Sequence, residues 1–226
     1  MTPYITRESN VIEIGCGTGY YGMHFAPQCN TYLGVDIAPA HAAKFQEKIE
    51  QANIKNAAVQ IGDATNLIDI PAASFDVVLV LGPMYHLPPE ERALAFSETK
   101  RICKPGGTLA YAYINRIGAY LTGCFLSSAE YPTLRANTFA LEQSRDDLRP
   151  ELFYFTMPEE IAVCAADHGL TVLENVGVDY MFTAELINEA SQEQLAAWDA
   201  IFLAMNKSST CSGTSNHALM ICKNDA

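Results

Sequence analysis

Short apolar runs alternate with segments of helical periodicity along the first half of the chain. An apolar run bounded by turn residues is typical of a strand buried on both faces, and its alternation with helices indicates a parallel sheet covered on both sides. We therefore expect an α/β fold. The expected strands lie near residues 10–14, 31–35, 57–61, 75–81 and 107–114, and the expected helices near 18–27, 39–52 and 89–103.

The alternation stops between residues 115 and 157. This stretch contains Gly118 and Pro132 and shows no clean strand pattern. An irregular segment of this length inside a compact domain is typically a lid or a cap. We expect a cap there, followed by a helix from Met157 to His168, a strand near 170–178, a helical stretch near 184–206 and a last strand at 218–222.

Composition and charge argue against nucleic acid and membranes as partners and favour a reducing compartment. The chain has 226 residues, 49% of them apolar, and a net charge of −12, which suits one domain with its own core and argues against nucleic acid. The polar start and the absence of an apolar run near the roughly 20 residues of a membrane span predict no membrane partner. The seven cysteines show no paired spacing. We therefore expect a reducing cytoplasm, no disulfides and no metal site.

A glycine turn follows the first expected strand. Gly15, Gly17 and Gly19 come directly after Val11–Ile14, and Asp36 ends the second expected strand. Glycine lets the backbone turn sharply and come close to a ligand. A carboxylate at the tip of the next strand can accept hydrogen bonds from both hydroxyls of a ribose. This segment predicts a nucleoside-binding site.

One alternative is a nicotinamide dinucleotide, because Gly17 to Gly22 fits the pattern G-x-G-x-x-G. The register argues against it. In a dinucleotide fingerprint the first glycine follows directly on the strand, which is the position of Gly15, and Tyr20 then stands where the third glycine belongs. Glu13 adds a charge near the end of the strand that needs a partner, and the ammonium group of a cofactor would be suitable. An NAD-dependent oxidoreductase is therefore the less favoured alternative.

Several motifs in order resemble those of class I S-adenosylmethionine-dependent methyltransferases, over residues 10 to about 114. Leu81–Leu87 narrows the resemblance to the small-molecule-type methyltransferase domains of bacteria. The matching segments are Glu13-x-Gly15-x-Gly17-x-Gly19 for the first motif, Asp36 for the ribose acid, Gly62-Asp63-Ala64 for the adenine turn, Phe75–Leu81 for the fourth strand and Lys104-Pro105-Gly106-Gly107 for the turn before the fifth.

The resemblance implies a Rossmann-like, doubly wound, mostly parallel seven-stranded sheet with a reversed last strand and an inserted cap. We expect a single methyltransferase domain over residues 1–226, with a cofactor-binding half at 10–114, a cap or acceptor segment at 115–157 and a C-terminal part at 158–223. The family usually carries a helix before the first motif, and ten residues precede Val11. Either the chain is shortened, the cap closes the cofactor site, or a partner chain does so, as in a homodimer.

The resemblance also implies roles for individual residues. Gly15 and Gly17 would pass close to the methionine moiety, Asp36 would bind the ribose and Asp63 the adenine amino group. The alternatives are that Asp36 caps the next helix and that Asp63 is a simple turn residue. The full set of expected cofactor-binding residues is Glu13, Gly15, Gly17, Gly19, Asp36, Ile37, Asp63, Ala64 and Leu81.

His86 and Tyr85 follow the fourth expected strand, where open α/β sheets bind their ligands. They are the candidate catalytic residues. Imidazole has an unperturbed pKa of about 6.5, which suits a general base, although His86 could equally be a hydrogen-bonded part of the pocket wall. Aromatic residues further along either line the acceptor pocket or pack in the core; these are Tyr111, Tyr113, Tyr120, Phe125 and Tyr131.

The expected function is methyl transfer from S-adenosylmethionine to a small-molecule acceptor by in-line displacement. The alternative is a protein that binds S-adenosylmethionine without catalysis and serves regulation or interaction. The sequence does not specify the acceptor, because its determinants fall in the irregular segment 115–157 and in residues 179–206.

Overall fold

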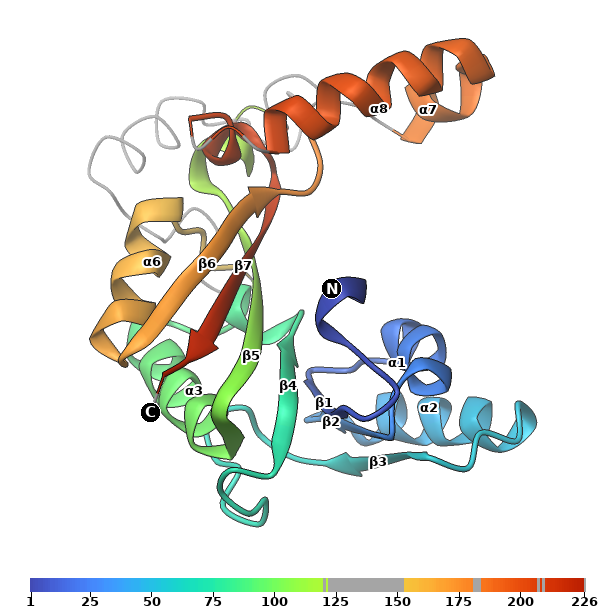
Figure 1. Cartoon of the computed structure of the whole chain (residues 1–226), viewed down its shortest axis with the longest axis vertical. Helices are drawn as coiled ribbons and strands as arrows, with labels where there is room; N and C mark the ends of the chain where they lie inside the picture. Colours follow the sequence, from blue (N-terminus) through green and yellow to red (C-terminus); the bar gives the residue numbers. More distant parts are fainter. Residues whose placement is uncertain (120, 122–152, 181–183, 207, 209, 226) are drawn as a thin grey trace. The chain divides into compact units, whose positions relative to one another are not determined.

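The computed structural model describes residues 1–119, 121, 153–180, 184–206, 208 and 210–225 (Figure 1). Most of the expected cap therefore lies outside the described residues. The chain divides into two compact units, which we describe separately. Unit 1 comprises Met1–Ala112, Ala162–Leu173 and Ile221–Ala226, and unit 2 comprises Tyr113–Ile161 and Glu174–Met220. The single domain expected over 1–226 stays a prediction.

Seven strands form one mixed sheet in the order β3-β2-β1-β4-β5-β7-β6, with β7 reversed. The strands from β1 to β5 pair in parallel. This confirms the predicted sheet and its reversed last strand. The strands are β1 Asn10–Ile14, β2 Thr31–Asp36, β3 Ala57–Ile61, β4 Phe75–Val80, β5 Cys103–Ile114, β6 Leu170–Gly177 and β7 His217–Asn224.

The fifth strand begins earlier than the sequence predicted. Cys103 already pairs with Phe75, and the register then shifts so that Thr108 pairs with Val77. The residues between them bulge out of the ladder, and Gly106 takes a φ of +76° within the bulge. Glycine accepts this left-handed conformation without a Cβ clash, which is why the Pro-Gly-Gly stretch interrupts the pairing without ending the strand.

The helices agree with the expected ones except at two places. The helix expected at 18–27 is short, because Pro27 follows it and a 3₁₀ turn at Ala26–Gln28 takes over. The stretch 184–206 is two helices rather than one. Ser191 and Gln194 exchange hydrogen bonds between backbone N–H and side chain, a capping box that starts the second helix. The helices are α1 Tyr20–Phe25, α2 Pro39–Gln51, α3 Pro89–Ile102, α6 Pro158–Asp167, α7 Ala184–Glu189 and α8 Gln192–Asn206.

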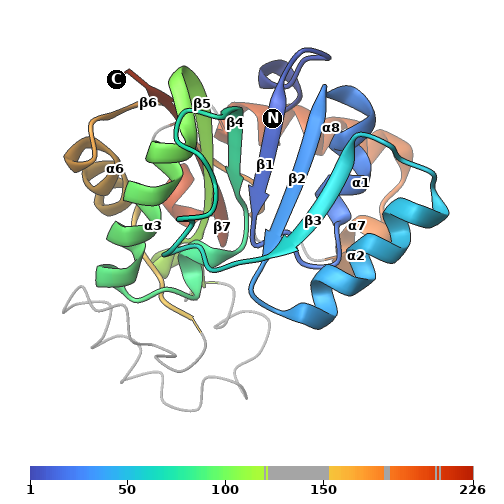
Figure 2. The ribbon, with the colours of Figure 1, turned by 90° about the horizontal axis from the view of Figure 1, so that it is seen from below.

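In unit 1, α1 and α2 pack on one face of strands β1 to β3 (Figure 2). The central strands β1 and β4 are buried from Val11 to Ile14 and from Val77 to Val80, and these residues are apolar except for Glu13, as expected for parallel strands covered on both faces. Phe45 of α2 is 0% exposed and forms the centre of this packing. A Cβ added at Gly19, Gly22 or Gly34 would lie within 3 Å of the Phe45 ring. Three glycines thus make room for one phenylalanine.

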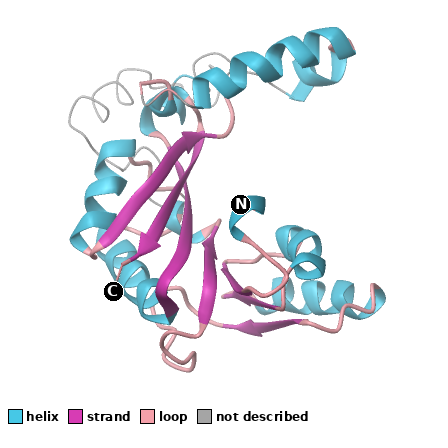
Figure 3. Ribbon diagram, viewed as in Figure 1, coloured by secondary structure: helices cyan, strands magenta, loops and turns pink. Residues whose placement is uncertain are grey.

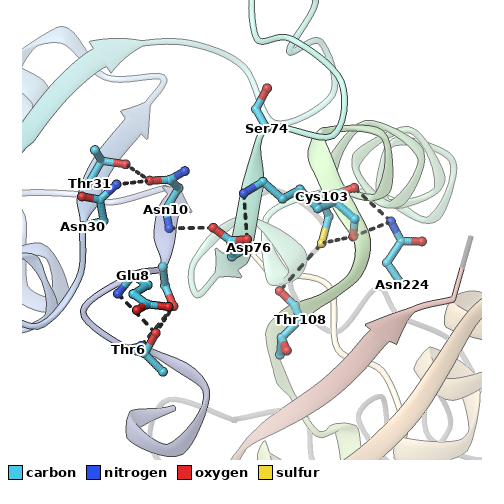
Figure 4. A network of polar contacts seen from close by, with 12 residues as sticks. Thr6, Glu8, Asn10, Asn30, Thr31, Ser74, Asp76, Cys103, Thr108 and Asn224 are labelled. Atoms are coloured by element: carbon cyan, nitrogen blue, oxygen red, sulfur yellow. Dashed lines mark hydrogen bonds and ion pairs between the residues drawn. The ribbon is translucent and has the colours of Figure 1, made fainter.

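Asp76 links the amino-terminal ends of β1, β4 and β5 by hydrogen bonds (Figure 4). Its Oδ2 accepts a hydrogen bond of 2.9 Å from the Asn10 N–H, and its Oδ1 accepts one of 2.8 Å from Lys104 Nζ. The start of β1 is thereby held to the start of β4 and to the bulge in β5. The opposite, carboxyl-terminal end of the strands is left for ligands, as is usual in open α/β sheets.

Unit 2 contains an ion pair between a buried arginine and a half-buried glutamate. Arg116, with 2% of its side chain exposed, donates two hydrogen bonds to Glu160 at 3.1 and 3.0 Å. Glu160 also accepts the Met157 N–H, which fixes the start of α6. The same unit carries α7 and α8 as consecutive helices (Figure 3). Among the helices that the structure describes, none is long and apolar enough to cross a membrane.

The expected aromatic residues are divided between the units. Tyr111 is fully buried in unit 1, where its hydroxyl contacts Thr99 Oγ1 at 2.9 Å. Tyr113 is buried in unit 2 and donates a hydrogen bond of 2.7 Å to Asn175. Both therefore pack in the core. Tyr120, Phe125 and Tyr131 lie outside the described residues.

Candidate functional site

The glycine turn after β1 is tied to the end of β2 by three backbone N–H groups. Gly15 and Cys16 donate to the Val35 carbonyl at 2.7 and 3.0 Å, and Gly17 donates to Asp36 Oδ2 at 2.7 Å. Gly15 and Gly17 have φ values of +74° and +52°, which favour glycine. The turn is therefore held to the end of β2 through its backbone N–H groups, and the space beside Gly17 is open.

A cavity of about 460 Å³ opens at the carboxyl-terminal end of the strands in unit 1. It is formed by the glycine turn, the start of α2, the turn after β3 and the loop after β4. Seven of the eleven predicted site residues line it, namely Gly15, Gly17, Asp36, Ile37, Asp63, Ala64 and His86. Glu13, Gly19, Leu81 and Tyr85 are not among the lining residues.

Asp36 makes a hydrogen bond next to the start of α2 and also lines the cavity, while its contact with a ribose stays a prediction. Its Oδ1 accepts the Ala38 N–H at 2.9 Å just before α2 begins, and the side chain also faces the cavity. The carboxylate thus stabilises the start of α2 and is available to a ligand. Ile37 beside it is 69% exposed, so an apolar surface next to Asp36 remains for a flat ring to cover.

Asp63 also combines a local and an outward role. Its Oδ1 accepts hydrogen bonds of 2.8 Å from both the Thr65 N–H and the Thr65 hydroxyl, the pattern of an Asx turn. The same residue lines the cavity beside Ala64. The turn therefore fixes the direction of the carboxylate, and an adenine contact stays a prediction.

Glu13 lies beneath the glycine turn and is 1% exposed. The Tyr32 hydroxyl donates a hydrogen bond of 2.5 Å to its Oε2. Burial raises the pKa of Glu13 from 4.5 to about 8, against the opposing effect of the Tyr32 hydrogen bond. The side chain is therefore protonated at neutral pH and has a partner within the protein. Pairing with a cofactor ammonium group stays a prediction.

This buried acid makes stability depend on pH. A carboxyl group whose pKa is raised in the folded state stabilises folding only while it is protonated, so its contribution falls as pH rises from 4.5 through about 8. Glu13→Gln keeps the shape and removes the titration. We expect the free energy of unfolding of this variant, relative to the parent, to increase by a few kcal/mol across that window, since each unit of pKa shift is worth about 1.4 kcal/mol. Urea unfolding of both proteins at pH 5 and pH 8.5 measures this difference. An equal fall in the free energy of unfolding of both proteins between the two pH values would contradict the prediction.

Gly19 and Tyr85 have packing roles in the structure. Gly19 precedes α1 with a φ of +81°, and a Cβ there would lie 2.0 Å from the Phe45 ring. The Tyr85 hydroxyl donates to the Leu81 carbonyl at 3.4 Å. Burial raises the pKa of Tyr85 above 10, so the phenol stays protonated at neutral pH and is not available as a base.

His86 lies in the cavity wall at the end of the loop after β4. The backbone N–H of His86 donates a hydrogen bond of 2.8 Å to the Pro83 carbonyl, which closes a 3₁₀ turn at Pro83–Tyr85. The Pro83 ring lies against the glycine turn, because a Cβ at Gly15 would be 2.6 Å from its Cδ. The loop that carries the candidate base is therefore in direct contact with the turn.

Sequence reasoning missed His41. It stands in the first turn of α2, lines the cavity and places its Nδ1 3.2 Å from Asp36 Oδ1. The signal was its position five residues after Asp36 and two after the helix-starting Pro39, which puts it next to the carboxylate.

The cavity fits a nucleoside cofactor. Its volume lies within the range of roughly 300–1,000 Å³ of small-molecule sites. No atom of the described residues comes within 4 Å of a Cβ built at Gly17, so the backbone there is open to a ligand.

Comparison with known proteins agrees with this geometry. Residues 11–107 match the family described as a methyltransferase domain. Residues 11–107 therefore form a methyltransferase domain of the class I, S-adenosylmethionine-dependent kind. A ubiquinone biosynthesis O-methyltransferase from Acinetobacter baumannii is 29% identical to this methyltransferase over 171 residues, which cover 75% of this chain and 67% of the relative.

Two further matches extend the comparison. An S-adenosyl-L-methionine-dependent Diels-Alderase from Talaromyces variabilis is 31% identical over 110 residues, 48% of this chain and 37% of that protein. The crystal structure of an S-adenosylmethionine-dependent methyltransferase from Methanosarcina mazei matches with a TM-score of 0.65 at 14% identity, over 98% of this chain and 95% of that one. The methyltransferase uses S-adenosylmethionine as its cofactor and a small molecule as its methyl acceptor, as predicted.

Proposed function

We propose that this methyltransferase transfers the methyl group to an oxygen atom of its acceptor and that His86 is the general base. The observation that carries the proposal is the position of His86 in the wall of the cofactor cavity, directly after β4. The A. baumannii relative, an O-methyltransferase by name, supports oxygen as the acceptor atom. A hydroxyl group must lose its proton as it attacks the methyl group, and a base beside the cavity can accept that proton.

The bound cofactor supplies a methyl group on a sulfonium sulfur. The residues of the chain position the reactants and manage the proton. Gly15 and Gly17 allow the backbone to approach the ligand, Asp36 and Asp63 orient it through hydrogen bonds, and Ile37 covers an apolar ring. His86 accepts the proton of the acceptor hydroxyl. Correct placement alone supplies about 7–11 kcal/mol of the barrier, so most of the catalysis would come from positioning.

Removing the base tests this proposal. We expect His86→Ala and His86→Gln to lower kcat by about 100- to 10,000-fold, the usual contribution of general base catalysis. The dissociation constant for S-adenosylhomocysteine should change by less than about threefold, because a base acts on the acceptor and not on the cofactor. Transfer of labelled methyl groups to a panel of phenols and alcohols, with calorimetry on both variants, measures the two quantities. Transfer confined to amines or thiols, or full activity without His86, would overturn the proposal.

A second candidate is a reaction that uses bound S-adenosylmethionine without methyl transfer. The match to a Diels-Alderase that depends on the same cofactor favours it. The ratio of S-adenosylhomocysteine to product separates the two functions. A ratio of one indicates methyl transfer, and product formed without S-adenosylhomocysteine indicates the second candidate.

The proposal also covers compartment and partners. Five described cysteines are free thiols, which supports a reducing cytoplasm; these are Cys16, Cys29, Cys103, Cys211 and Cys222. The net charge of −12 argues against nucleic acid as the acceptor. A homodimer stays a prediction, and analytical ultracentrifugation with and without the cofactor tests it.

A further inference from the structure

The Asp36 carboxylate is crowded by donors from the protein itself. Oδ2 accepts the Gly17 N–H at 2.7 Å, and Oδ1 accepts the Ala38 N–H at 2.9 Å. His41 Nδ1 lies a further 3.2 Å from Oδ1. A carboxylate offers about four lone-pair sites, so roughly one remains for a ligand. A ribose presents two hydroxyls, and the carboxylate by itself has too few acceptor sites for both.

His41 is placed to supply the missing acceptor. Its side chain is 54% exposed, whereas that of Asp36 is 8% exposed, and both residues line the same cavity. An ionised carboxylate only accepts hydrogen bonds, so the ring nitrogen that faces it, Nδ1, carries the proton of this contact. In a neutral imidazole the other nitrogen, Nε2, is then an acceptor. With Nδ1 bound to the carboxylate, Nε2 of His41 is a second hydrogen-bond acceptor in the cavity beside Asp36.

We infer that Asp36 and His41 form a two-residue site for the ribose diol. One hydroxyl donates to the Asp36 carboxylate and the other donates to His41 Nε2. His41 is thus a cofactor-binding residue that discriminates ribose from deoxyribose. The inference rests on the proposed role of Asp36 in cofactor binding.

Hydroxyl-deleted ligands test this assignment. The probes are S-adenosylhomocysteine and its 2′-deoxy and 3′-deoxy forms, titrated by calorimetry into the parent protein, His41→Ala and His41→Asn. In the parent we expect each deoxy form to bind about tenfold more weakly than the full ligand. In both His41 variants one deoxy form should bind as well as S-adenosylhomocysteine, because the hydroxyl that it lacks no longer has a partner in the protein. The other deoxy form should still bind about tenfold more weakly.

Two controls make the result decisive. His24→Ala removes an exposed histidine that does not line this cavity and should keep both penalties. Thermal melting of each variant without ligand shows that the fold is retained. Survival of both penalties in the His41 variants would overturn the inference. A parent protein that binds none of the three ligands would instead overturn the proposed function, so the two failures are distinct.

Discussion

Replacement of Asp36 with alanine is expected to weaken binding of S-adenosylhomocysteine by at least about 100-fold, or roughly 2.7 kcal/mol. Two losses add up. The ligand loses a hydrogen bond to a charged group, worth about 1.5–3 kcal/mol. The Gly17 N–H also loses its 2.7 Å partner, so the glycine turn is no longer fixed to the end of β2. Calorimetric titration at constant salt measures the change.

A matched variant separates this effect from a change in net charge. Asp69 is exposed and does not line the cavity, so Asp69→Ala removes the same charge elsewhere in unit 1 and should bind normally. Asp36→Asn should fall close to Asp36→Ala, because an amide NH₂ cannot accept the backbone N–H groups that surround the carboxylate. Normal affinity in Asp36→Ala would show that the ribose binds elsewhere.

Gly17 and Gly19 of the same motif are expected to respond to alanine with different losses of stability. Gly19→Ala should lower the free energy of unfolding by about 2–5 kcal/mol, since a left-handed φ costs roughly 1–2 and a Cβ forced into a packed core costs about 1–3 more. The Cβ would lie 2.0 Å from the Phe45 ring. Gly17→Ala should cost about 1–2 kcal/mol, for its φ alone, because the space beside it is open.

Cofactor affinity should show the reverse order. The methyl group of Gly17→Ala points into open space at the cavity wall, where we propose that the ligand binds, so we expect binding to be lost while the fold persists. Thermal melting and calorimetry on the same samples compare the two variants. Equal destabilisation by both, or normal binding by Gly17→Ala, would contradict the division of the motif into a ligand-facing and a core-facing glycine.

The fold followed from the sequence because buried parallel strands are continuous apolar runs. The strands at 10–14 and 57–61 were predicted to the residue. Spacing predicted that Gly15, Asp36 and Asp63 come together, since each lies at or just after the end of a strand and the ends of parallel strands meet at one edge; all three line the same cavity. Spacing does not give the direction of a side chain. The sequence therefore could not predict that Glu13 accepts a hydrogen bond from Tyr32 or that Gly19 lies against Phe45, and their contacts with the cofactor stay predictions.

One feature could have been read from the sequence and was not. Ser191 and Gln194 have the three-residue separation of a capping box, which marks the start of α8 inside an apparently continuous helical pattern. His41 belongs to no motif, and its importance depends on where the first turn of α2 places it relative to the carboxylate. The break in β5 required the three-dimensional pairing, because a bulge depends on the partner strand as much as on its own residues.

The contact between Gly15 and Pro83 has a consequence for attempts to redesign the acceptor. The proline ring fills the volume in which any other residue at position 15 would place its Cβ, so the two positions share one space. Enlarging the acceptor region by mutating the turn would push the loop of His86 outward and displace the base together with the wall. Trimming position 83 instead would open room from the other side and leave the backbone of the turn intact. A smaller residue at position 83 would not by itself admit a larger one at position 15, because the left-handed φ of Gly15 strains any residue with a Cβ.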